Sequence, residues 1–124
     1  MADAATTPPA GFTRLTIGGE FISANGPLYE RLDGALYQLG FRVEARHTNS
    51  MGICHGGMMA SFCDMLLPLG AFRRVDALRT RFLPTVSLQI DYRAPAPRPS
   101  TSLRSCCCSQ PWITPMSASV DGRT

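Results

Sequence analysis

Residues 47–64 combine the residue types that acyl-transfer chemistry uses. The stretch reads HTNSMGICHGGMMASFCD and holds both histidines of the chain and one acidic residue in an apolar run. The pattern predicts that a helix begins at or near His55, directly before Gly56 and Gly57. The first N–H groups of a helix are unpaired, and the peptide dipole adds positive charge there. Since glycine lets a carbonyl approach these amides closely, the stretch predicts an oxyanion site.

Asp64 is the candidate general base or nucleophile for such a site. It lies eight residues after Gly56, which places the two ~12 Å apart along one helix. A base must come within about 3 Å of the reacting group, directly or through one water. One chain therefore cannot supply both groups to one site. Either Asp64 acts from a neighbouring subunit, or it is a structural acid that Ser or Thr hydroxyls satisfy.

The other polar positions also have structural interpretations. His55 could simply begin the helix and hold the loop, and Asn49 is a natural cap or turn residue. The paired glycines could serve close packing of the helix on a strand. A Cys–His nucleophile pair fails on geometry, because Cys54 adjoins His55 in sequence and Cys63 lies about two turns along the helix.

The flanking sequence predicts the elements that position this stretch. Residues 35–49 alternate between apolar and polar positions, which predicts a half-buried strand. Residues 56–71 are apolar on nearly every side, which predicts a helix surrounded by protein, and Pro68 is expected to kink or end it. Residues 84–95 alternate again and predict a second strand. Together these elements indicate a sheet that curls around its helix.

Composition narrows the class of protein. With 124 residues, 44% hydrophobic and 17% charged, the chain suits one globular domain. Its net charge of +3 comes with arginine and no lysine, which favours a phosphate-bearing small molecule over nucleic acid. No apolar run is long enough for a membrane span and no secretory signal is visible, so we expect a cytoplasmic protein. The five cysteines show no zinc-type spacing, so no metal is expected.

A family resemblance rests on Asn49, Gly52, the His55-Gly56-Gly57 triplet and Asp64, followed by TVSLQIDYRAPAP. These motifs resemble the hotdog-fold thioesterases of the phenylacetate-pathway (PaaI-like) type, over about residues 26–97. The resemblance implies an α+β hotdog fold, in which an antiparallel sheet wraps around a central helix. It also implies a homodimer or homotetramer that hydrolyses aryl- or medium-chain acyl-coenzyme A at sites built across a subunit interface.

The resemblance also implies roles for individual residues. The Gly56 N–H would polarise the thioester carbonyl, and Asn49 would orient the carbonyl or the water. Asp64 of the partner chain would activate water or attack directly, with the Thr85 hydroxyl near that water. His55 and Gly57 complete the expected site. Further candidates for the coenzyme A phosphates, unless they form a solvated basic loop, are Arg73, Arg74, Arg79 and Arg81. No cofactor is implied, because coenzyme A is part of the substrate.

The two ends of the chain differ from its middle in amino-acid composition and in hydrophobic pattern. Residues 1–25 are expected to form a flexible leader, residues 26–97 a partial hotdog domain, and residues 98–124 an atypical tail rich in Pro, Ser and Cys. The tail lacks the strands that should complete the sheet, so a frameshift or truncated reading near Arg98 is one hypothesis. The alternatives to an enzyme are then a non-catalytic protein that binds acyl-coenzyme A and an inactive remnant.

Overall fold

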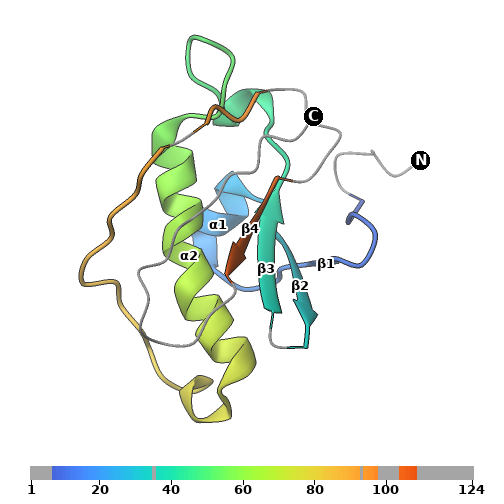
Figure 1. The fold of residues 1–124 in the computed structure, drawn as a ribbon, viewed down its shortest axis with the longest axis vertical. Helices are drawn as coiled ribbons and strands as arrows, with labels where there is room; N and C mark the ends of the chain where they lie inside the picture. The colour runs from blue at the N-terminus through green and yellow to red at the C-terminus, as the bar shows by residue number, and fades with distance from the viewer. Residues whose placement is uncertain (1–6, 35, 93, 98–103, 109–124) are drawn as a thin grey trace.

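One antiparallel sheet and one long helix dominate the structure, which is a computed structural model (Figure 1). It describes residues 7–34, 36–92, 94–97 and 104–108, the last range by its backbone alone. The elements, in chain order, are β1 (Thr13–Arg14), α1 (Gly19–Asn25), β2 (Tyr29–Asp33), β3 (Leu36–Phe41), η1 (Ala45–His47), α2 (Gly56–Arg74), η2 (Asp76–Leu78) and β4 (Arg104–Cys108). The strands form an antiparallel sheet in the order β1-β2-β3-β4.

The hairpin of β2 and β3 forms the centre of the sheet. Tyr29 pairs with Gly40 and Asp33 with Leu36, and Gly34 adopts the positive φ of 58° that the turn requires. Alternate side chains of β3 point into the core, where Tyr37 and Leu39 are almost fully buried. The strand predicted within residues 35–49 is therefore confirmed for residues 36–41 only. It ends early because residues 45–47 turn into a 3-10 helix.

The predicted central helix is confirmed. It begins at Gly56, next to His55, as the sequence predicted. Of the two effects expected of Pro68, a kink or an end, the end is not observed at this residue, because the helix continues to Arg74. Proline removes only the hydrogen bond to the Asp64 carbonyl, while Leu66 and Leu69 on either side of it are buried in the core. The helix lies close to the sheet at Gly70, where an added Cβ would be 3.3 Å from the Tyr37 ring.

The prediction of a second strand at residues 84–95 is wrong. Residues 83–92 form no ladder, and the Val86 side chain is 97% exposed. In the sheet order β1-β2-β3-β4, β3 has β2 on one side and β4 on the other, so the segment does not pair with the central strand that precedes the helix. The segment instead passes α2 on the side away from the sheet (Figure 1). As a result the expected enclosure of the helix is incomplete, and Leu67 is 58% exposed.

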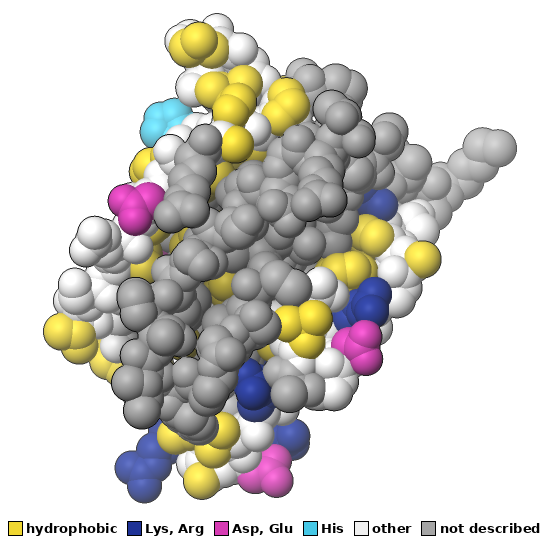
Figure 2. Space-filling model, viewed as in Figure 1, with side chains coloured by type: hydrophobic (Ala, Val, Ile, Leu, Met, Phe, Trp, Pro, Cys, Tyr) yellow, Lys and Arg dark blue, Asp and Glu magenta, His cyan; other side chains and the backbone are white. Residues whose placement is uncertain are grey.

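Several apolar side chains are exposed in or beside the segment of residues 83–92, which passes this side of the helix. The space-filling view shows hydrophobic groups at the surface in several places (Figure 2). The large ones within or beside the segment are Phe82, Val86, Leu88 and Tyr92. The alternation places Val86, Leu88, Ile90 and Tyr92 on one face, and of these Ile90 packs against the core. An antiparallel sheet packed on one long helix is nevertheless compatible with the α+β hotdog class.

The outer parts of the chain contribute to the fold. Within residues 1–25, Leu15 and Ile22 are buried in the core, so much of the predicted leader is folded, and residues 1–6 lie outside the described residues. Within the predicted tail, the backbone of β4 pairs with β3, while residues 98–103 and 109–124 lie outside the description. In the described part of the chain, no helix has both the length and the apolarity to cross a membrane.

Candidate functional site

The backbone amides at the start of α2 differ in their hydrogen bonding within the described part of the chain. His55 is the N-cap, and its Nδ1 accepts a hydrogen bond from the Gly57 N–H at 2.8 Å. The His55 carbonyl accepts from the next two amides, those of Met58 and Met59. Among the described residues, the Gly56 N–H has no acceptor. The predicted oxyanion donor is therefore the amide at the helix start that remains available.

Tyr92 lies against Gly56, a contact that the sequence did not predict. Its hydroxyl donates to the Gly56 carbonyl oxygen at 2.8 Å, and a Cβ added at Gly56 would lie 3.4 Å from the ring. The alternating pattern places Tyr92 on the same face of a predicted strand as Ile90. Nothing in the local sequence indicates that its hydroxyl reaches the helix start.

The structure brings two of the predicted catalytic side chains, those of Asp64 and Thr85, together within one chain. The Thr85 hydroxyl donates to Asp64 Oδ1 at 2.5 Å, and Asp64 is partly exposed. This contact satisfies one carboxylate oxygen, as the structural interpretation of Asp64 required. Among the described residues, Oδ2 has no donor.

Asn49 holds the loop that leads into the helix. Its Oδ1 accepts from the Met51 N–H at 2.9 Å, and its backbone carbonyl accepts from Gly52, whose φ is 74°. This is the Asx turn expected of an asparagine in a tight loop. The side-chain NH₂ has no acceptor among the described residues, so it remains the part of Asn49 that could contact a ligand.

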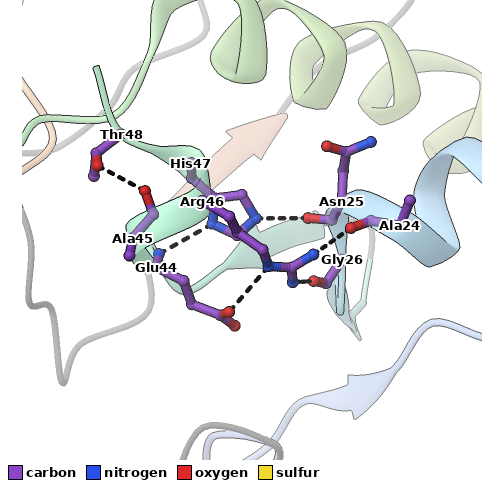
Figure 3. Close-up of polar contacts among 8 residues, drawn as sticks. All are labelled: Ala24, Asn25, Gly26, Glu44, Ala45, Arg46, His47 and Thr48. Carbon is purple, nitrogen blue, oxygen red and sulfur yellow. Dashed lines mark hydrogen bonds and ion pairs between the residues drawn. The ribbon is translucent and has the colours of Figure 1, made fainter. Parts of the chain in front are cut away.

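His47 ties the same loop to the rest of the fold, which the sequence also did not predict. This buried ring accepts from the Glu44 N–H at its Nδ1, and its Nε2 lies 2.8 Å from the Asn25 carbonyl oxygen (Figure 3). Neighbouring Arg46 bonds to the carbonyls of Ala24 and Gly26 (Figure 3). Because the His47 carbonyl accepts from the His55 N–H at 2.7 Å, this cluster fixes where α2 begins.

The arginines predicted to bind phosphate lie at the far end of α2 and beyond it. Arg73 lies ~25 Å along the helix from Gly56 and forms a bidentate ion pair with Glu30 of β2, at 2.6 and 3.0 Å. The hydrogen bond to Glu30 raises the pKa of Arg73. Arg79 pairs with Asp76, and Arg74 and Arg81 are exposed. Arg73 therefore already links the helix to the sheet.

We expect Arg73→Ala to lower the free energy of unfolding by about 1 kcal/mol, because it leaves a largely buried carboxylate with fewer partners. The Glu30 side chain is only 14% exposed, which limits solvent screening. Denaturant unfolding measures this loss. Arg79→Ala is the matched control, since its pair is exposed on both sides and should contribute almost nothing. Unchanged stability in Arg73→Ala with a raised KM for acyl-coenzyme A would instead favour phosphate binding.

Cys54 is expected to resist alkylation in the folded protein. Burial raises the pKa of its thiol to about 11, so the reactive thiolate is scarce near neutral pH. Because the unfolded thiol ionises at about 8.5, this group lowers stability as the pH rises above that value. Peptide mass spectrometry after iodoacetamide treatment at pH 8 should find Cys54 unmodified in native protein and modified in denatured protein. Equal modification in both would contradict its burial.

A family comparison covers the helix, the acid and the segment with Thr85. Residues 51–104 match the thioesterase superfamily. The matched range contains Gly56, Asp64, Thr85 and Tyr92, whereas Asn49 and the hairpin of β2 and β3 precede it. A search of curated proteins found no match to the chain. The thioesterase match indicates thioester hydrolysis as the general class of reaction. No group of three or more potential metal-ligand side chains gathers in the described part of the chain.

Proposed function

We propose that this protein hydrolyses aryl- or medium-chain acyl-coenzyme A to the free acid and coenzyme A, as a homodimer or homotetramer. One observation carries the proposal. A single helix presents an open amide at its start and a hydrogen-bonded carboxylate further along, within the range that matches the thioesterase superfamily.

The Gly56 N–H would bind the thioester carbonyl oxygen. The helix dipole favours negative charge at this end, and the absence of a side chain at Gly56 allows close approach. Negative charge develops on the carbonyl oxygen as the carbon becomes tetrahedral, so this amide stabilises the transition state more than the substrate. The Asn49 NH₂ group would help to orient the carbonyl or the water.

Asp64 would act on the water. Thr85 holds Oδ1 at 2.5 Å, which leaves Oδ2 to accept a proton as the water oxygen attacks the carbonyl carbon. The tetrahedral intermediate then collapses, the C–S bond breaks, and the proton passes to the leaving thiolate. Direct attack by the carboxylate would instead break the C–S bond, release the thiolate and form a mixed anhydride, which water then hydrolyses.

The proposed chemistry would use two copies of the chain, and the spacing along α2 supports this. Gly56 and Asp64 lie ~12 Å apart on the same helix, several times the reach of a base. An antiparallel pair of α2 helices would place the acid of one copy beside the amide of the other. Each pair of chains would then hold two equivalent sites.

Mixing two inactive variants tests this arrangement directly. Purified wild-type protein is first assayed for thiol release from phenylacetyl-, benzoyl- and medium-chain acyl-coenzyme A. Asp64→Asn and Gly56→Pro proteins are then unfolded together and refolded. A mixed dimer carries both lesions in one site and none in the other, so random pairing should restore about a quarter of the wild-type activity. No recovery in soluble mixed dimers would reject the shared site. Substrate binding without release by the wild type would favour a binding protein.

A further inference from the structure

Both polar atoms of the peptide that joins Gly56 to Gly57 are held by side chains. The Tyr92 hydroxyl donates to its carbonyl oxygen at 2.8 Å, and its N–H donates to His55 Nδ1 at 2.8 Å. The two side chains come from opposite directions in sequence, one just before the helix and the other 36 residues after Gly56. The peptide plane is thereby fixed from both sides.

This restraint matters because both residues of the peptide are glycines. Glycine has the widest range of backbone angles, so an unrestrained Gly-Gly pair at a helix end varies in orientation. The direction of the Gly56 N–H depends on the same backbone. An oxyanion donor stabilises charge best when its geometry is set before the reaction. Hydrogen bonds that share one peptide group also strengthen each other by polarising it.

The approach of Tyr92 depends on local contacts in the chain that follows it. The Cys54 N–H donates to the Ala96 carbonyl oxygen at 2.8 Å, and Ile53 and Pro97 form a β-bridge. Ile90, on the other side, packs against the core. Tyr92 therefore lies between two fixed points beside the loop that precedes the helix. Glycine at position 56 leaves room for its ring, which a Cβ there would approach to 3.4 Å.

We propose that Tyr92 is a positioning residue for thioester hydrolysis, which acts through the Gly56–Gly57 peptide to orient the Gly56 amide. This inference rests on the proposed function. Its hydroxyl contacts the backbone and not the reacting atoms, so Tyr92 affects how well the amide stabilises the oxyanion. Because this hydroxyl is bonded to the Gly56 carbonyl oxygen and not to the substrate, we expect substrate affinity not to depend on it.

The test is Tyr92→Phe, which removes the hydroxyl and keeps the ring. We expect kcat to fall about fivefold, the factor that one net hydrogen bond supplies, with KM unchanged. Tyr37→Phe is the matched control, because it also removes a single tyrosine hydroxyl bond, the one to Glu30 at 2.9 Å on the sheet. It should lower the melting temperature and leave kcat unchanged. An unchanged kcat in Tyr92→Phe, or a fall no larger than that of Tyr37→Phe, would overturn the inference.

Amide hydrogen exchange separates this inference from the proposed function. In Tyr92→Phe the Gly57 amide should exchange about fivefold faster than in the wild type, and its amide proton chemical shift should change, whereas Tyr37→Phe should alter neither. Thiol release is not needed for this measurement. A wild-type protein without thiol release would reject the proposed function, whereas an unchanged Gly57 amide in Tyr92→Phe would reject the restraint by Tyr92 alone.

Discussion

Asp64→Asn is expected to lower kcat for thioester hydrolysis by about 10²- to 10⁴-fold, the contribution of a positioned general base. Asparagine has nearly the volume of aspartate, and its side-chain oxygen can still accept from Thr85 as Asp64 Oδ1 does at 2.5 Å. The substitution therefore removes the basic oxygen and keeps the contact. Steady-state thiol release measures the effect, and the melting temperature should change little.

Thr85→Val provides the comparison for Asp64→Asn. It removes the donor to Oδ1 and leaves the base in place, so kcat should fall only by about fivefold to tenfold. If Asp64→Asn kept most of the activity and Thr85→Val destabilised the protein, the pair would be a structural contact. A loss in Asp64→Asn that far exceeds that in Thr85→Val would identify Asp64 as the group that acts on water or on the carbonyl.

Gly56→Pro should lower kcat by about 10²- to 10³-fold, the cost of losing one oxyanion donor. Proline has no N–H, so it deletes the proposed donor itself. The fold should tolerate it, because Gly56 is the first residue of α2, where proline is favoured. His55 already has ψ 136°, within the range that a following proline requires. Circular dichroism should therefore find the helix intact while thiol release is nearly lost.

Gly56→Ala is the matched control for Gly56→Pro. It adds the same Cβ, 3.4 Å from the Tyr92 ring and thus in ordinary contact, but it keeps the N–H. Its kcat should stay within about tenfold of the wild type, since only the approach of the substrate is affected. Equal losses in the two variants would mean that bulk at position 56, and not the missing amide, reduces the activity.

Local sequence patterns predicted the elements that depend on nearby residues. The start of α2 follows from an N-cap followed by glycines and an apolar run, and β3 follows from its alternation. The same alternation misled at residues 84–95, because it identifies a segment that could form a strand but not whether an edge is free for it. The edge of β3 is occupied by β4, from a part of the sequence that shows no strand period.

Among the polar contacts of the site, the local ones were predictable from the sequence and the long-range ones were not. Asn49 and His55 bond to amides within two residues, at Met51 and Gly57, so capping and turn preferences predicted a structural role for each. The contact of Thr85 with Asp64 spans 21 residues, and only the family resemblance associated these two with one site. Tyr92 and His47 act through tertiary contacts that neither propensity nor spacing contains, so their roles emerge from the structure alone.

The position of both proposed reacting groups, Gly56 and Asp64, on α2 would constrain how this chain can vary in length. Each inserted or deleted residue between Gly56 and Asp64 would rotate the acid by about 100° around the helix axis and displace it by ~1.5 Å. In a two-fold assembly the same error would occur in both active centres at once, and no loop lies between the two groups to absorb it. Related sequences with this chemistry should therefore keep the eight-residue interval, and place their insertions before the helix or after Arg74.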